Sequence, residues 1–159
     1  MSRLSADQRS QLQAMLGDRV TFRRTERRLY GHDIAAMPGM IKPLVGDTTP
    51  EAVVQPRTEE ELAALVRWAA ARNVPLTPRG KASSGYGGVL PVKKGVLVDF
   101  YRMNRVIGID AEAQTATVQA GGTFSLTREF VGLQSGTATA QTQDPHGLYS
   151  NEAWYVITV

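Results

Sequence analysis

The residues best suited to bind a ligand lie in one short segment, TPRGKASSGYGGVLP, at residues 77–91. Glycine accepts positive φ angles and has no side chain, so successive backbone amides of such a segment can converge on an anion. Composition alone leaves two alternatives, a loop that binds a phosphate group and a plain turn between two strands. The residues in question are Arg79, Gly80, Lys81, Ser83, Ser84, Gly85, Gly87 and Gly88.

The segment departs from the familiar nucleotide motifs. A Walker loop has serine or threonine after its lysine, whereas Lys81 is followed by Ala82. The dinucleotide-binding fingerprint opens a helix directly after its glycines, and the sequence predicts no helix there. The segment is therefore a candidate phosphate loop of another kind.

Other catalytic chemistries find little support in this chain. It has no cysteine, which excludes disulfides, thiolate metal sites and cysteine nucleophiles. His32 and His146 have no partners at metal-ligand spacing, so we expect structural roles for both. Glu59, Glu60 and Glu61 suit the start of a helix better than acid–base catalysis. We expect no catalytic and no metal-binding residue here.

The positive charge is concentrated near the N-terminus. The net charge is +3, and residues 1–28 hold seven arginines against three acidic residues. This stretch is either a solvated helix face, which we favour, or a surface for nucleic acid or an acidic partner. Interleaved aromatic residues of the kind that bind single-stranded nucleic acid are absent from the stretch, which disfavours nucleic acid. With no apolar run of membrane-spanning length and no visible secretory signal, a cytoplasmic location is expected.

The elements before the glycine-rich segment form a βαβ pattern. Residues 52–55 read as a short apolar strand, and residues 74–77 as a second one. Between them, Thr58 and Glu61 form a capping box at the start of an amphipathic helix. The two strands should therefore be parallel neighbours. The glycine-rich segment leaves the carboxyl end of the second strand, where open α/β sheets bind ligands.

The rest of the chain predicts shorter elements. Residues 4–16 form a helix that Ser5 can cap, and residues 30–50 form an irregular arm lying on the body. The fold class is α/β, a small mixed sheet with a βαβ unit and a β-hairpin. After the loop we expect a strand at 95–100 that is apolar on both faces, a hairpin of 105–110 with 115–119, a helix at 123–131, a polar loop at 135–152 and a strand at 153–159.

Four pieces of the sequence occur in a recognisable order, namely QPRTEEEL, PRGKASSGYGGVLP, VLVDFYRMNRV and ATVQAG. With them, residues 29–122 resemble the first part of the FAD-binding (PCMH-type) domain of the vanillyl-alcohol oxidase/p-cresol methylhydroxylase superfamily. The likeness is to the glycolate oxidase and D-lactate dehydrogenase branch, and the Tyr-x-x-Asp spacing of YGHD at 30–33 also suits that branch. The resemblance implies the N-terminal lobe of such a domain, with FAD as its cofactor.

The resemblance implies a role for each loop residue. Backbone amides of residues 79–84 would cradle the FAD pyrophosphate, helped by a serine hydroxyl. Pro78 would fix the start of the loop, and Gly87 and Gly88 would let the chain pass close to the cofactor. The implied cofactor-binding residues are Pro78, Arg79, Gly80, Lys81, Ala82, Ser83, Ser84, Gly87 and Gly88.

Three positions of the loop qualify this assignment. Arg79 could aim its charge at phosphate or brace the loop, and we favour bracing. Lys81 and Ala82 stand where the superfamily usually has small residues, and a left-handed Ala82 would cost about 1–2 kcal/mol. The loop contains no histidine, so the covalent flavin link that some branches make there is impossible, and non-covalent binding is expected.

The resemblance divides the chain into three segments. Residues 1–50 are the helix and arm, residues 51–122 are the FAD-binding lobe with its pyrophosphate loop at 78–88, and residues 123–159 are an atypical tail in place of the second lobe. The implied function is the FAD-binding part of an oxidoreductase acting on a 2-hydroxy acid such as glycolate or D-lactate. Another lobe or chain would complete the flavin site. The alternative is a non-catalytic remnant or interaction module with weak or no FAD binding.

Overall fold

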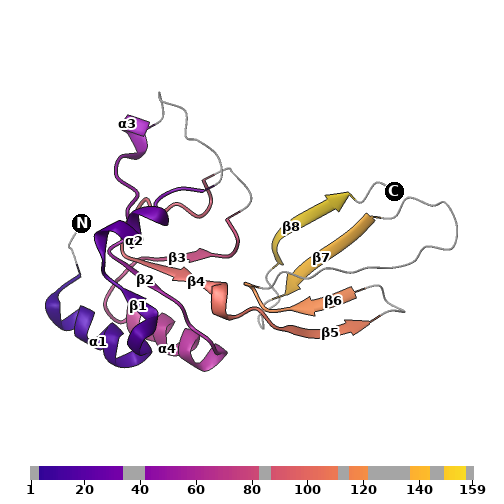
Figure 1. The fold of residues 1–159 in the computed structure, drawn as a ribbon, viewed down its shortest axis with the longest axis horizontal. Helices are drawn as coiled ribbons and strands as arrows, with labels where there is room; N and C mark the ends of the chain where they lie inside the picture. Colours follow the sequence, from indigo (N-terminus) through magenta and orange to yellow (C-terminus); the bar gives the residue numbers. More distant parts are fainter. Residues whose placement is uncertain are drawn as a thin grey trace, which may run out of the picture. The chain divides into compact units, whose positions relative to one another are not determined.

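The computed structural model describes residues 4–33, 42–82, 87–110, 115–121, 137–143 and 149–156. The chain divides into two units, Met1–Arg102 and Met103–Val159 (Figure 1). The first unit holds α1 (Ala6–Leu16), β1 (Val20–Thr21), α2 (Arg24–Leu29), α3 (Lys42–Val45), β2 (Ala52–Val54), α4 (Glu59–Ala70), β3 (Leu76–Arg79) and β4 (Val96–Asp99). The second unit holds β5 (Val106–Asp110), β6 (Thr115–Val118), β7 (Thr137–Gln143) and β8 (Tyr149–Val156). The three segments expected from the sequence, with boundaries after residues 50 and 122, stay a prediction.

A four-stranded sheet in the order β1-β2-β4-β3 forms the centre of the first unit. β2 and β3 both run parallel to β4, and Ala52 and Leu76 lie on either side of Val96. β1 pairs antiparallel with β2. The expected parallel direction of β2 and β3 is confirmed, but the prediction that they are neighbours is wrong, because β4 lies between them.

Burial explains why β4 takes the central position. All four of its residues are buried, so both of its faces are covered. β3 is only partly buried, and it contains Pro78, which has no N–H group for a ladder hydrogen bond. Proline is confined largely to edge strands, so β3 belongs at the edge of the sheet. The predicted α/β class with a small mixed sheet is confirmed.

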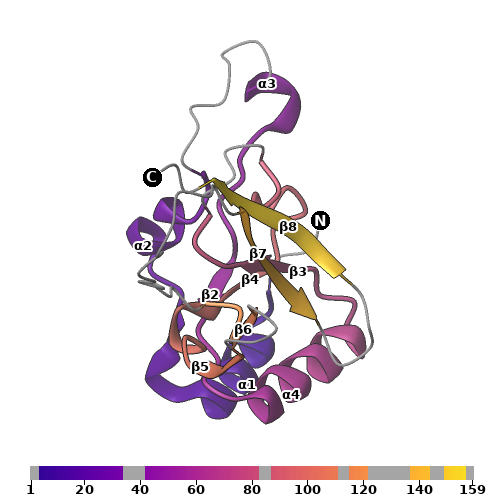
Figure 2. The ribbon, with the colours of Figure 1, turned by 90° about the vertical axis from the view of Figure 1, so that its right-hand side faces the viewer.

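Two helices, α1 and α4, lie together on one side of this sheet (Figures 1 and 2). Leu12 and Leu16 of α1 and Leu65 of α4 are fully buried and pack in one cluster with alternate residues of β2 and β4. The indole N–H of Trp68 donates to the Gln11 side chain at 2.7 Å and so joins the two helices. This apolar layer supports the sheet whose ends carry the polar residues described below.

Local capping signals start both helices. The Ser5 hydroxyl accepts from the Gln8 N–H at 3.1 Å, and the Gln8 side chain accepts from the Ser5 N–H at 2.8 Å, a complete capping box. The Thr58 hydroxyl accepts from the Glu61 N–H at 3.3 Å, as predicted. The Glu61 carboxylate also accepts from the Arg57 N–H at 2.8 Å.

The starts of the three parallel strands meet at Gly95. The Gly95 carbonyl accepts from the Glu51 N–H at 2.7 Å, and the Val96 N–H donates to the Pro75 carbonyl at 2.9 Å. Gly95 has φ +68°, and a Cβ atom placed on it would lie 2.3 Å from the Pro75 oxygen. Only glycine fits this crossing of the chain without displacing a neighbouring strand.

The second unit contains two antiparallel strand pairs. β5 pairs with β6, which confirms the predicted hairpin, and β7 pairs with β8, with Thr137 opposite Val156. The predicted polar loop at 135–152 is wrong, because β7 and the first part of β8 occupy most of it. Threonine is β-branched and favours strands despite its polarity, and it recurs along β7. The helix expected at 123–131 lies outside the described residues.

Candidate functional site

Polar side chains gather where the three parallel strands of the first unit end. Gln55 directly follows β2, Arg79 is the last residue of β3, and Asp99 is the last residue of β4. Because β2, β3 and β4 are parallel, their carboxyl ends lie at the same edge of the sheet. This is the edge at which open α/β sheets bind ligands.

A buried carboxylate organises this edge. The side chain of Asp99 accepts from the Tyr30 hydroxyl at 3.0 Å and from the Gln55 amide at 2.7 Å, and its second oxygen accepts from the Tyr101 N–H at 3.1 Å. Burial first, and then the Asp99 carboxylate, raise the pKa of Tyr30, so its hydroxyl stays protonated and donates. The network connects residue 30 of the arm to the ends of β2 and β4.

Arg79 binds the arm at the start of the glycine-rich loop. Its guanidinium donates to the His32 carbonyl at 2.8 Å, and its Cζ lies 5.4 Å from the centre of the Tyr30 ring. Of the two roles considered for Arg79, the bracing contact is the one observed. His32 takes part through its backbone carbonyl, not as a ligand of a metal.

The far end of the loop is bound to the same arm. The Gly87 N–H donates to the carboxylate of Asp33 at 2.7 Å, and Asp33 is itself buried. Gly87 has φ +80°, the left-handed conformation that favours glycine. One segment, residues 30–33, therefore fixes the loop at both ends, through Arg79 at its start and Gly87 at its end.

Two unusual residues of the loop adapt to its shape. Ala82 has φ +56° and is buried, which is the left-handed conformation considered from the sequence. A residue with a Cβ pays about 1–2 kcal/mol for that conformation, and the surrounding contacts must offset it. The Lys81 ammonium lies 5.3 Å from the centre of the Tyr101 ring, a cation–π contact that links the loop to the chain after β4.

The structure therefore brings most of the expected loop residues into one place. Pro78 and Arg79 end β3, Gly80, Lys81 and Ala82 follow directly, and Gly87 and Gly88 lie at the far end of the loop. The expected phosphate-binding Ser83 and Ser84 lie outside the described residues. The assignment of these nine residues to cofactor binding stays a prediction.

Sequence reasoning missed the residues that hold the loop in place. The Asp33 carboxylate accepts from the Gly87 N–H, a contact that the sequence does not predict. Gln55 and Asp99 received no role, although each ends a parallel strand. The available signals were the Tyr-x-x-Asp spacing of residues 30–33 and the polar residue that follows each buried strand.

The site can bind and orient, but its described residues offer little for catalysis. A loop that combines left-handed and ordinary backbone conformations at a strand end can turn its N–H groups toward an anion. Within the described parts of the chain, no three His, Asp or Glu side chains are grouped to hold a metal ion. Among the same residues, no helix has the length and apolarity to cross a membrane. The described residues show how the two ends of the loop are fixed to the arm.

Comparison with known proteins identifies a family and several relatives. Residues 50–148 match the family described as FAD binding domain, a range that continues beyond Gly122, where the sequence likeness noted above ends. The glycolate oxidase subunit GlcD of Bacillus subtilis is 38% identical over 72 residues, 45% of this chain and 15% of that protein. The mitochondrial D-lactate dehydrogenase [cytochrome] of Arabidopsis thaliana is 31% identical over 112 residues, 70% of this chain and 19% of that protein.

A solved structure shares the fold as well. p-Cresol methylhydroxylase with bound substrate superposes with a TM-score of 0.60 and 27% identity, over 72% of this chain and 22% of that one. The chain thus spans less than a quarter of the length of each of these proteins. What it shares with them is the part that contains the sheet and the glycine-rich loop.

Proposed function

Because the chain belongs to the family of FAD binding domains, and FAD is its cofactor, we propose that the 78–88 loop holds the pyrophosphate of FAD. The backbone amides of residues 79–84 donate to the phosphate oxygens, and a hydroxyl of Ser83 or Ser84 adds a further donor. Gly87 and Gly88 allow close approach of the chain. Binding is non-covalent, since the loop has no histidine to form a covalent link.

The observation that carries this proposal is the attachment of the loop to residues 30–33 at both of its ends. The Arg79 guanidinium donates to the His32 carbonyl at 2.8 Å, and the Asp33 carboxylate accepts from the Gly87 N–H at 2.7 Å. Because the Arg79 guanidinium already binds a carbonyl of the protein, recognition of the phosphate falls to the amides between the two ends of the loop. A loop fixed in advance loses less conformational entropy on binding, which increases affinity.

The conformation of Ala82 is a second observation that supports FAD binding by this loop. The strain of its left-handed conformation is retained although alanine is unsuited to it. Strained conformations are kept mostly where function requires them. At this position the conformation changes the direction of the neighbouring N–H groups and so helps them to converge on an anion.

We place the chain in an oxidoreductase that acts on a 2-hydroxy acid of the glycolate or D-lactate type. The support is the likeness to a glycolate oxidase subunit and to D-lactate dehydrogenases. When bound, the flavin supplies the redox chemistry, and this chain supplies binding and orientation. Turnover requires a further lobe or chain, because we assign no catalytic residue here.

The alternative is a non-catalytic interaction module of the same fold. FAD titration followed by flavin fluorescence and the visible spectrum separates the two. Near-stoichiometric uptake, with FAD released by acid precipitation, is the expected result. Protein that is colourless after incubation with excess FAD and removal of the free FAD would support the interaction module instead. Flavin retained on the precipitated chain would refute non-covalent binding.

Loop variants test the placement of the pyrophosphate. Gly80→Val puts a branched side chain among the proposed amide donors, and Asp33→Ala releases the far end of the loop. We expect Gly80→Val to abolish FAD binding and Asp33→Ala to weaken it about tenfold, the loss of one charge-assisted hydrogen bond. Gly108→Val is the matched control, because a Cβ there meets no atom within 4 Å. Unchanged affinity in both loop variants, with unchanged circular dichroism, would place the cofactor elsewhere.

The assignment of no catalytic residue to this chain has its own test. Glycolate or D-lactate is added without oxygen to the chain loaded with FAD, and the flavin spectrum is followed. We expect no bleaching with this chain alone. Rapid bleaching by either acid would show that the chain already holds the residues for oxidation.

A further inference from the structure

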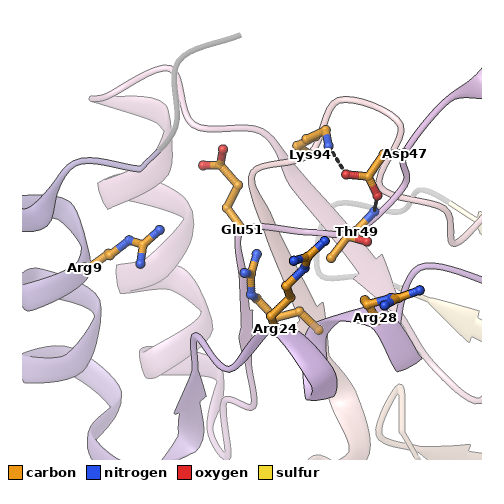
Figure 3. A pocket seen from close by; sticks show the side chains of 8 residues that line it. Arg9, Arg24, Arg28, Asp47, Thr49, Glu51 and Lys94 are labelled. Atoms are coloured by element: carbon orange, nitrogen blue, oxygen red, sulfur yellow. Dashed lines mark hydrogen bonds and ion pairs between the residues drawn. The ribbon is translucent and has the colours of Figure 1, made fainter.

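The edge of the sheet opposite the loop carries a second, strongly basic pocket. It has a volume of about 500 Å³ and is lined by residues of α1 and α2 and by the segments before β2 and β4 (Figure 3). Glu51 immediately precedes β2 and Lys94 lies two residues before β4, so the pocket is at the amino ends of the strands. The loop of the proposed function is at their carboxyl ends, and the two sites are separate.

Five cations line this pocket against two carboxylates. The cations are Arg9 on α1, Arg24, Arg27 and Arg28 on α2, and Lys94. Figure 3 shows the side chains of Arg24 and Arg28 near the segment of residues 47–51, with Arg9 farther away on α1. The formal charge of the lining is therefore +3, in a chain whose total net charge is also +3.

The two carboxylates are already occupied by other partners. Asp47 accepts from the Lys94 ammonium at 2.5 Å and from the Thr49 N–H at 3.0 Å. The Lys94 hydrogen bond, more than any other contact, lowers the pKa of Asp47, which keeps it ionised and paired. Glu51 is buried and accepts from the Leu4 N–H at 2.6 Å. Both acids act on the charge of Arg27, but neither forms an ion pair with Arg9, Arg24 or Arg28 among the described residues.

Two of the arginines contact other parts of the protein, and Arg24 and Arg28 are exposed. Arg27 donates to the Phe22 carbonyl at 3.0 Å and to the Pro50 carbonyl at 2.6 Å, so it anchors α2 to the segment before β2. The Arg9 guanidinium lies 5.3 Å from the centre of the Phe22 ring. Burial lowers the pKa of Arg27 and the charges of Arg9 and Arg24 lower it further, whereas Glu51 and Asp47 act in the opposite direction. Arg9, Arg24 and Arg28 form no ion pair with any acidic residue in the described part of the chain.

We propose that this pocket is a binding site for a small polyanion that carries at least two phosphate or carboxylate groups. Its volume is within the range of small-molecule sites. Guanidinium groups from two helices offer bidentate donors to either kind of anion. A ligand with several negative charges would neutralise the lining, whereas a neutral or singly charged one would not.

Nucleic acid fits the same charges less well. Single-stranded nucleic acid binds through aromatic side chains on which the bases stack, and the lining contains none. The cations also line a hollow instead of a long groove that could follow a phosphate backbone. The solvated helix face favoured from sequence stays a prediction to which this pocket is the alternative, and nucleic acid stays disfavoured.

The test is isothermal titration with two probes, inorganic pyrophosphate and citrate, at constant ionic strength. We expect one of them to bind with one-to-one stoichiometry, and the comparison tells whether phosphate or carboxylate is preferred. Arg24→Gln/Arg28→Gln should weaken that binding about tenfold or more, since two charge-assisted contacts are lost. The control Arg57→Gln/Arg67→Gln removes two exposed arginines outside the pocket and should change affinity by less than about twofold.

Several results would overturn the proposal. Equal weakening by both double variants would mean diffuse attraction, and failure of both probes to bind would mean no site. The amide chemical-shift changes that the probe causes in NMR spectra should cluster at α2 and residues 47–51, and changes located elsewhere would refute the site. Pyrophosphate binding lost in Gly80→Val but retained in Arg24→Gln/Arg28→Gln would put the probe in the loop. Tighter binding of a single-stranded RNA that the same double variant abolishes would replace the small ligand by nucleic acid.

Discussion

Replacement of Gly95 by alanine tests how the three parallel strands are held at their starts. Gly95 has φ +68°, and the new Cβ would lie 2.3 Å from the Pro75 oxygen and 3.1 Å from the Pro75 Cβ. The first distance is far below any normal contact, so the starts of β3 and β4 must separate. That movement breaks the hydrogen bond from the Val96 N–H to the Pro75 carbonyl, now 2.9 Å.

The expected loss of stability follows from three contributions. The left-handed conformation costs alanine about 1–2 kcal/mol. The broken hydrogen bond costs about 1 kcal/mol more. Alanine also has fewer conformations than glycine in the unfolded chain, which stabilises the folded state by about 0.4–1 kcal/mol. We therefore expect Gly95→Ala to lower the free energy of unfolding by about 2 kcal/mol or more, depending on how far the strands move.

Gly46→Ala is the matched control for this experiment. Gly46 has φ +71°, and a Cβ there meets nothing within 4 Å, so only the conformational cost applies. That cost, less the unfolded-state gain, is about 0.5–1 kcal/mol. Urea unfolding is followed by tryptophan fluorescence in a Trp154→Phe background, which leaves Trp68 of the first unit as the reporter. If both variants lose the same stability, the contact with Pro75 is not what requires glycine, and the reasoning is refuted.

Two further changes test the contacts that position the sheet and the arm. Glu61→Gln removes the carboxylate that accepts from Arg19 at 2.7 Å, a contact that is the main cause lowering the pKa of Glu61 to about 2. Because the pKa of Glu61 in the folded state lies below its unfolded value near 4.5, the stability of the wild type should fall as the pH drops from about 5 to 2. The variant should be about 1 kcal/mol less stable at neutral pH and should lack this fall, as measured by urea unfolding at a series of pH values. Tyr30→Phe removes a donor to the buried Asp99 and should cost about 1–2 kcal/mol by the same method, whereas an unchanged midpoint would mean that water replaces the hydroxyl.

The predictable parts of the fold are those with local signals. Ser5 and Thr58 mark the starts of α1 and α4, because a cap depends on residues only three positions apart. The loop was placed at the end of β3 for a similar reason, since glycine and proline act on their own backbone. Local chemistry of this kind is readable without any knowledge of the neighbours.

The order of the strands was not predictable by the same reasoning. The sequence of β4 is apolar on both faces, which shows that it is buried but not which strands cover it. Its insertion between β2 and β3 depends on the relative burial of three separate strands, including the edge position of Pro78. β7 was missed because its threonines and glutamines are polar, and pairing with β8 overrides that composition.

Only part of the candidate site could be predicted from the sequence, for a related reason. The loop residues are contiguous, so the segment stands out in the sequence, although its residue types alone leave a phosphate loop and a plain turn as alternatives. The groups that fix the loop come from residues 30–33 and from the ends of other strands, and no local pattern connects Asp33 to Gly87 or Gln55 to Asp99. A resemblance that includes the Tyr-x-x-Asp spacing identifies the arm but not the partners of its side chains.

The attachment of the loop to the arm means that the loop is not a portable motif. Asp33 and Gly87 are 54 positions apart, and Tyr30 and Asp99 are 69 apart. Contacts between such distant residues require a long segment of chain to form a closed loop, and this loses more conformational entropy than a local turn does. The same fifteen residues transplanted to another strand end would carry the glycines without the clamp that shapes them. The position of the loop therefore depends on the N-terminal arm, which contacts it through His32 and Asp33.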